Sequence, residues 1–157
     1  DGAKYIAERK LPKKLLDHLY YTENFIKILS ENGIKKYKYI PKNDKRIVIP
    51  IYHNGVLTYI QGRSIIKDSP IRYINIQLNE GLKIWNYDNI DWSKDVYLTE
   101  GVFDASYFFP NAGAMLTNTI DFKLIEKHKE VFFKLYIIPS IGRVHFCCPP
   151  YRCGRFG

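Results

Sequence analysis

The alternation of apolar and polar positions is clearest in residues 46–62. RIVIPIY alternates, is rich in β-branched residues, and is followed after Asn54-Gly55 by the second run VLTYIQG. Because both turn residues tolerate positive φ, this pattern predicts a tight β-hairpin. A further short strand is expected at residues 72–76, and an irregular connection at 82–91.

Helical periodicity dominates residues 12–33. Pro12 suits a first helical position, Thr22 suits the N-cap of a second helical stretch, and Gly33 suits a C-terminal stop. Two apolar faces at helical spacing support this prediction: Leu15, Leu16 and Leu19, then Phe25, Ile26, Ile28 and Leu29. The segment that follows, IKKYKYIP (34–41), is basic and aromatic and is expected to be extended.

Strands and helices alternate in the second half of the chain. The expected elements are a strand at 95–99, a helix at 102–109, a strand at 111–116, a helix at 120–128 and a strand at 131–138. Such alternation implies a parallel sheet that binds ligands at the carboxyl ends of its strands. The expected fold class is α+β, with a mixed basic α/β subdomain (1–90) followed by an α/β parallel-sheet subdomain (91–139).

Charge is unevenly distributed over the 157 residues. The net charge of +8 divides into +7 over residues 1–90, −2 over 91–139 and +3 over 140–157. Basic surface attracts polyanions and clustered acids attract divalent metals, so the pattern suggests nucleotide or nucleic-acid chemistry. No apolar run is long enough to span a membrane. The chain lacks a signal peptide and an initiator Met, so we expect an internal piece of a longer protein.

The last eighteen residues form an atypical tail. SIGRVHFCCPPYRCGRFG contains all three cysteines, three arginines and no lysine. One reading is a zinc or disulfide tail built from Cys147, Cys148, Cys153 and His145, but this spacing matches no common zinc pattern, and zinc is not expected. The other reading, which we prefer, is an end unrelated to the domain that packs poorly against it.

Candidate chemistry gathers at Glu100, which follows an apolar strand and precedes Gly101. Asp104 lies about one helical turn further on, so the two carboxylates reach the same region. Two neighbouring acids repel unless a cation joins them, and Mg2+ prefers such oxygen ligands. The alternative is that both acids merely stabilise a helix N-terminus, by about 0.3–1 kcal/mol each.

Two sequence blocks resemble known enzymes. DVYLTEGVFDASYF resembles the first signature of TOPRIM domains, and NAGAMLT (111–117) their next element. The family's third strand ends in an Asp-x-Asp pair, whereas VFFKLYIIPS contains no Asp. NDKRIVIPIYHNGVLTYIQGRSIIKDSPIRYIN resembles the basic RNA-polymerase subdomain of bacterial and phage DNA primases. Because other TOPRIM enzymes lack this basic block, the combination favours a primase catalytic core over residues 35–139.

The primase resemblance implies template-directed synthesis of short RNA primers on single-stranded DNA. It implies Mg2+ or Mn2+ as cofactor, ribonucleoside triphosphates as substrates, a replicative helicase as partner, and a cytoplasmic location, in the host if the protein is phage-encoded. Glu100 is carried over as a metal ligand or acid–base residue and Asp104 as an outer ligand. The nucleic-acid or nucleotide site is carried over to these positions: Arg46, Arg63, Arg72, Tyr73 and Lys45. Tyr59 is a further candidate for base stacking.

Two other functions stay open. The missing Asp-x-Asp pair is compatible with a non-catalytic module that binds single-stranded DNA. TOPRIM chemistry alone is compatible with nuclease or topoisomerase-like phosphodiester cleavage. Dependence on Mg2+ and on ribonucleotides distinguishes the three. His18, His53 and His128 each stand alone, and no phosphate-binding glycine loop or dinucleotide fingerprint is present.

Overall fold

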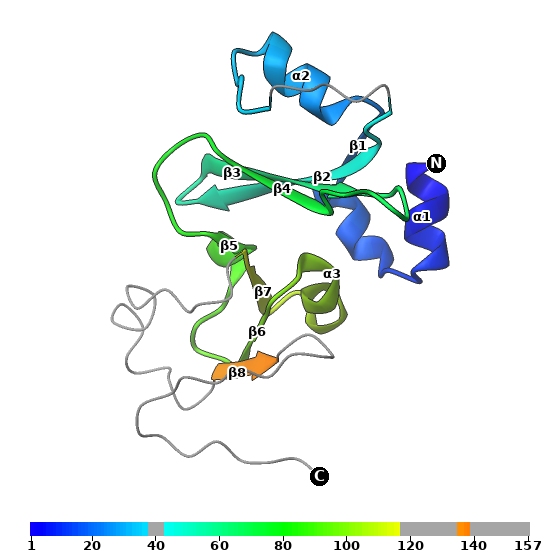
Figure 1. Cartoon of the computed structure of the whole chain (residues 1–157). Coiled ribbons are helices and arrows are strands. Elements are labelled where there is room, and N and C mark those ends of the chain that lie inside the picture. The colour runs from blue at the N-terminus through cyan, green and yellow to red at the C-terminus, as the bar shows by residue number, and fades with distance from the viewer. Residues whose placement is uncertain (38–42, 117–134, 139–157) are drawn as a thin grey trace.

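The computed structural model describes residues 1–37, 43–116 and 135–138 (Figure 1). The first sheet and its helices comprise α1 (Gly2–Glu8), the 3-10 helix η1 (Lys13–His18), β1 (Tyr20–Thr22), α2 (Phe25–Glu31), β2 (Arg46–His53), β3 (Val56–Ser64) and β4 (Tyr73–Gln77). The second part comprises β5 (Ile84–Trp85), η2 (Tyr87–Asn89), β6 (Val96–Thr99), α3 (Val102–Ala105), η3 (Ser106–Phe108), β7 (Ala112–Met115) and β8 (Leu135–Ile138). The predicted mixed α+β fold class is confirmed.

The first sheet is antiparallel, in the order β1-β2-β3-β4. The predicted hairpin forms β2 and β3, and its turn residues Asn54 and Gly55 have φ of +53° and +74°. A positive φ at both positions is what a two-residue hairpin requires, and it explains the Asn-Gly pair. The strand predicted at residues 72–76 forms β4, displaced by one residue.

Helix α2 covers the outer face of the first sheet (Figure 1). Its residues Phe25, Ile26 and Leu29 form one apolar cluster with Ile74 and Ile76 of β4. The Phe25 ring lies so close to β3 that a Cβ added to Gly62 would meet it at 2.6 Å, so this position requires glycine. The apolar face predicted for α2 is confirmed, except that Ile28 is exposed. The predicted C-terminal stop is also confirmed, because Gly33 follows the helix with a φ of +83°.

The second sheet has the order β5-β7-β6-β8. β6 is parallel to both β7 and β8, and β5 pairs antiparallel with β7 at the edge. The parallel sheet expected from strand and helix alternation is therefore present. The helix predicted at 120–128, residues 131–134 of the predicted third strand, and the tail lie outside the described residues.

The two sheets share one core. Ile47, Ile49 and Ile51 of β2 cluster with Val102 of α3 and Ala112 of β7, all of them buried. Figure 1 shows the second sheet and α3 on the side of the first sheet opposite α2. The chain passes from the first sheet to the second between β4 and β5. The subdomain boundary predicted at residue 90 stays a prediction.

Predictions for the N-terminal and connecting segments are wrong in part. Of the two helical stretches expected within residues 12–33, the first is the 3-10 helix η1 and the second is α2, but Tyr20–Thr22 between them forms β1 and pairs with β2. Thr22 does not cap α2, whose N-cap is Asn24. Helix α1 was not predicted, and the connection at 82–91 contains β5 and η2.

Asp88 of η2 connects the hairpin turn to the second part of the molecule by hydrogen bonds. The backbone N–H groups of Asn54 and Gly55 donate to the two carboxylate oxygens of Asp88 at 2.7 and 2.8 Å. Next to this contact, the Leu82 N–H donates to Nδ1 of His53 at 3.4 Å. These bonds link the turn between β2 and β3 to residues that precede β6.

We expect Asp88→Ala to lower the free energy of unfolding by about 1–2 kcal/mol, because two turn N–H groups lose a charged acceptor. Urea denaturation measures the loss, with Asp68→Ala as the control at another exposed carboxylate. Asp88→Asn should lose less, since its amide retains one acceptor oxygen. Equal stability of Asp88→Ala and the control would contradict the role of this contact.

Candidate functional site

A row of polar side chains lies along β3 and β4, on the face of the first sheet that faces the second sheet. In the strand register Arg63 pairs with Tyr73, and Gln61 pairs with Asn75. Arg63 also pairs with Ile47 of the shared core, and alternation along a strand places all four side chains on that side. The Gln61 amide donates to Asn75 Oδ1 at 2.9 Å. We call Arg63, Gln61, Tyr73 and Asn75 the polar lane.

Arg63 is the cation of the polar lane. Its side chain is largely buried, with Cζ 4.4 Å from the centre of the Tyr73 ring, and Tyr73 is 45% exposed. The described residues provide no carboxylate partner for this guanidinium group. The terminal nitrogens have no hydrogen-bond partner among the described residues, and Arg63 as a whole is 5% exposed. A positive charge held on an exposed aromatic ring can bind a phosphate.

Tyr5 of α1 links the polar lane to the acidic helix α3. Its hydroxyl accepts a hydrogen bond from Nε of Arg63 at 3.2 Å. Its ring lies 6.3 Å from that of Phe103, and the Arg9 guanidinium lies 5.0 Å from the Tyr5 ring and 5.7 Å from the Phe103 ring. Phe103 directly precedes Asp104. The N-terminal helix therefore connects the basic side of the candidate site to the acidic one.

Glu100 stands at the carboxyl end of β6, as predicted. It is half-buried, and the turn after it is held by the Thr99 hydroxyl, which donates to the Gly101 carbonyl at 2.7 Å. Asp104 is exposed in the first turn of α3, and its carboxylate lies over Gly101, where an added Cβ would come within 3.0 Å of Oδ2. The two acids thus lie on either side of Gly101, Glu100 after β6 and Asp104 in α3.

The ligand set at this turn is small. Glu100 and Asp104 offer oxygen donors of the kind Mg2+ and Mn2+ prefer, with water able to supply further ligands. No group of three or more His, Cys, Asp or Glu side chains that could hold a metal occurs in the described part of the chain. β8 lies beside β6, with Ile138 paired to Thr99. The residues that follow Ile138 in sequence lie outside the described ranges.

Arg46 differs from the other predicted arginines because its guanidinium is committed to internal partners. It is 2% exposed, and Nε donates to the Asp44 carboxylate at 2.7 Å. Its terminal nitrogens donate to the carbonyls of Gly62 and Ile71, each at 3.0 Å. Asp44 in turn accepts the Ile26 N–H of α2 at 2.9 Å. We therefore leave Arg46 out of the proposed interface and assign it to the folding of the first sheet.

The remaining predicted residues differ in accessibility. Arg72 is exposed directly before β4, and Lys45 is half-buried and paired with Asp1. Tyr59 is 4% exposed, with the Lys83 ammonium 5.6 Å from its ring centre, so it offers no free stacking face. Burial raises the pKa of the Tyr59 hydroxyl above its usual value. Of the two tyrosines considered for base stacking, Tyr73 alone is exposed.

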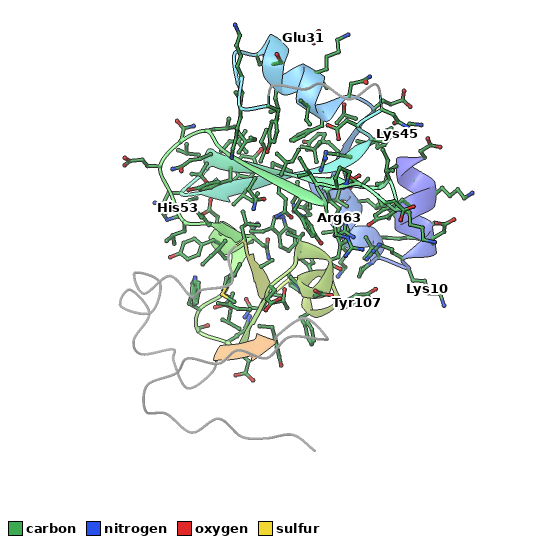
Figure 2. The ribbon with its side chains drawn as sticks, viewed as in Figure 1. Lys10, Glu31, Lys45, His53, Arg63 and Tyr107 are labelled. Carbon is green, nitrogen blue, oxygen red and sulfur yellow. The ribbon has the colours of Figure 1, made fainter. Side chains whose placement is uncertain are left out.

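Arg9 is a candidate that the sequence did not indicate. Its guanidinium is exposed at the end of α1, against Tyr5 and Phe103 (Figure 2 shows the neighbouring Lys10, with Arg63 and Tyr107 labelled). The sequence offered one signal for Arg9, the small number of arginines. Only four arginines precede residue 140, and Arg9 is the one that lies outside the recognised motifs. Its position beside α3 depends on tertiary packing.

The chain was compared with known proteins. No family model matches it. It is 33% identical over 124 residues to the DNA primase of Enterobacteria phage T4, a match that covers 78% of this chain and 35% of that primase. The chain thus spans about a third of the length of this relative.

Solved structures provide a second comparison. The primase of Aquifex aeolicus, with its zinc-binding and RNA polymerase domains, matches 87% of this chain and 42% of its own, with a TM-score of 0.58 and 22% identity. The RNA polymerase domain of Mycobacterium tuberculosis primase DnaG matches 88% of this chain and 58% of its own, with a TM-score of 0.63 and 11% identity. The same domain solved in complex with double-stranded DNA gives a TM-score of 0.58 and 14% identity, over 87% and 55% of the two chains.

These comparisons agree with the two sequence blocks. The phage relative confirms the resemblance to primases in sequence, and the bacterial domains confirm it in fold. The fold match covers 87–88% of the chain. In the described residues, no helix is both long and apolar enough to traverse a bilayer.

Proposed function

We propose that this chain, with the sequence and fold of a primase catalytic core, acts in the synthesis of short RNA primers on a single-stranded DNA template during replication. The observation that carries the proposal is the Tyr5 bridge, which joins the unneutralised Arg63 to the helix that follows Glu100. Polymerising nucleotides requires phosphate-binding cations close to carboxylates, and the contacts of Tyr5 with Arg63 and with Phe103 of α3 support a site that combines the two.

In the proposed reaction the 3′-hydroxyl of one nucleotide attacks the α-phosphate of an incoming ribonucleoside triphosphate and releases pyrophosphate. Arg63 and Arg72 would hold template or nucleotide phosphates, and the exposed face of Tyr73 would stack on a base. Glu100 would bind Mg2+ or Mn2+ or act as the acid–base residue, and Asp104 would be an outer ligand. A divalent cation bound there supplies charge neutralisation for the transferring phosphoryl group.

The proposal extends to the partners and location that the resemblance implies. These are a replicative helicase and the cytoplasm, which is the host cytoplasm if the protein is phage-encoded. Lys45 would contribute a further phosphate contact if its ion pair with Asp1 opens.

A primer-synthesis assay tests the proposed function. The chain is incubated with a single-stranded template and labelled ribonucleotides, with Mg2+ or with a chelator, and we expect metal-dependent dinucleotides. If the chain binds the DNA strand equally well with and without Mg2+ and makes no dinucleotide, the non-catalytic module is favoured. Nicking of DNA without ribonucleotides would favour phosphodiester cleavage of the nuclease type.

Arg63→Ala should weaken binding of a single-stranded oligonucleotide by about 5-fold at 0.1 M salt, because one phosphate contact is lost. The logarithmic salt dependence should become shallower by about 0.7. Fluorescence anisotropy at several salt concentrations measures both, with Lys27→Gln on α2 as the control for loss of one positive charge. Arg63→Lys should recover part of the affinity. An unchanged affinity in a folded Arg63→Ala protein would remove Arg63 from the site.

A further inference from the structure

We propose that Lys10, Lys13 and Lys14 form a second phosphate-binding surface that continues the candidate site and holds the backbone of a nucleic-acid strand as it leaves that site. We call these three residues the basic corner. The inference rests on the proposed function, because it assigns the strand a path away from the polar lane and α3.

The basic corner is continuous with the candidate site through Arg9. Arg9 contacts Tyr5 and Phe103 by its guanidinium, and its carbonyl accepts the hydroxyl of Tyr107 at 3.2 Å. Lys10 is the next residue in the chain. The start of the basic corner is thus fixed beside the helix that carries Asp104.

The backbone of the basic corner is held in place by hydrogen bonds. The N–H of Lys10 donates to the Ala7 carbonyl at 3.0 Å, and Lys10 itself adopts a left-handed conformation with a φ of +54°. The Leu15 N–H donates to the Pro12 carbonyl at 2.9 Å, and the Leu15 side chain is buried in the shared core. The backbone that carries the lysines is therefore held in place, with Lys10 in the turn after α1 and Lys13 and Lys14 in η1, which reduces the entropy lost when they bind a strand.

The positive charge of the basic corner is not neutralised by its neighbours. All three lysines are exposed, and none takes part in an ion pair with the described residues. Glu8, the acid that precedes them, lies 3.9 Å from the Lys4 ammonium. Asp17 is the single acid in residues 9–17, against four cations. Such a local excess of positive charge attracts a polyanion by releasing its counterions.

The length of the basic corner and an adjacent aromatic ring favour a nucleic-acid strand over a free nucleotide as its ligand. Lys10 and Lys14 are four positions apart in the chain, so their Cα atoms are at most about 14 Å apart, a length that corresponds to several phosphates of one strand. Tyr107, whose hydroxyl donates to the Arg9 carbonyl, is 57% exposed and offers a ring on which a base can stack. Phosphate contacts together with an aromatic ring are typical of surfaces that bind single strands.

The test uses the whole chain and a fluorescent single-stranded oligonucleotide. The variant Lys10→Gln/Lys13→Gln/Lys14→Gln is compared with Lys27→Gln/Lys35→Gln/Lys36→Gln, which removes the same charge from exposed lysines in and after α2. Each contacting lysine should contribute about 5-fold to affinity at 0.1 M salt, so the corner variant should lose up to about 100-fold and its salt dependence should become shallower by about 2. The α2 variant should change little.

The outcomes separate this inference from the proposed function. Equal losses in the two charge-matched variants overturn the basic corner, while a weakened Arg63→Ala protein still supports the proposed site. Absence of strand binding by the unmodified chain overturns both. If the triple variant fails to fold by circular dichroism, Lys13→Gln/Lys14→Gln replaces it and leaves the left-handed residue unchanged. A loss of less than about 3-fold in that folded double variant overturns the inference, and a loss of about 25-fold supports it.

Discussion

Glu100→Gln is expected to reduce dinucleotide synthesis by at least about 100-fold, because the amide cannot act as a base and is a poorer ligand for a divalent cation. The substitution keeps the size and the hydrogen-bonding shape of the side chain. Since Glu100 is half-buried at the end of β6, the fold should be retained. Asp104→Asn should have a smaller effect, of about 10-fold, if Asp104 is an outer ligand.

Three measurements make the Glu100 prediction specific. Primer synthesis is followed at several Mg2+ and Mn2+ concentrations, strand binding is followed by anisotropy, and thermal unfolding reports the fold. Strand binding should persist in Glu100→Gln, because the polar lane is intact. Glu80→Gln, at an exposed position in the connection between the sheets, is the matched control. Normal turnover by Glu100→Gln would remove Glu100 from the catalytic assignment.

Arg46→Ala is expected to lower the free energy of unfolding by about 3–5 kcal/mol, because it leaves the carboxylate of Asp44 buried without its partner. The carbonyls of Gly62 and Ile71 also lose their donors. The same carboxylate accepts the Ile26 N–H at the start of α2, so the attachment of α2 to the sheet should weaken as well.

Urea denaturation measures the Arg46 prediction as a lower midpoint with an unchanged slope. Arg72→Ala removes an exposed arginine and should change stability by no more than about 0.5 kcal/mol. Arg46→Leu combined with Asp44→Leu should recover part of the loss, because no charge is left buried alone. If Arg46→Ala is as stable as Arg72→Ala but binds template more weakly, Arg46 belongs to the interface after all.

The errors of the sequence reading concentrate in the first 33 residues. Leu15 to Leu29 has apolar spacing compatible with helix, yet Tyr20–Thr22 forms β1 because the edge of β2 offers backbone hydrogen bonds to a passing extended segment. A strand of three residues is too short for its alternation to be recognised. Helix α1 was missed because its stabilising contacts, such as Tyr5 with Arg63, join residues far apart in the sequence.

Arg63 and Arg46 belong to consecutive cross-strand pairs of β2 and β3, and this difference of one position gives the two arginines different roles. Arg63 pairs with Ile47, and the next pair in the ladder is Ser64 with Arg46. Adjacent positions along a strand point to opposite faces, so Arg63 faces the second sheet while Arg46 lies on the α2 side, with Cζ 6.0 Å from the centre of the Phe25 ring. The resemblance placed both arginines in the nucleic-acid site, with Arg46 in support of Arg63 and Arg72.

The sequence by itself determined the hairpin, the parallel strands of the second sheet and the Glu-Gly turn. The hairpin follows from Asn54-Gly55 and the β-branched alternation beside it, the parallel strands from the alternation of strands and helices, and the turn from Gly101 after β6. The tertiary structure decided which cations remain available. The carboxylate of Asp44 captures Arg46, whereas Arg9 and Arg63 converge on Tyr5 without a described acid. Charge compensation depends on distances through space, which spacing along the chain does not specify.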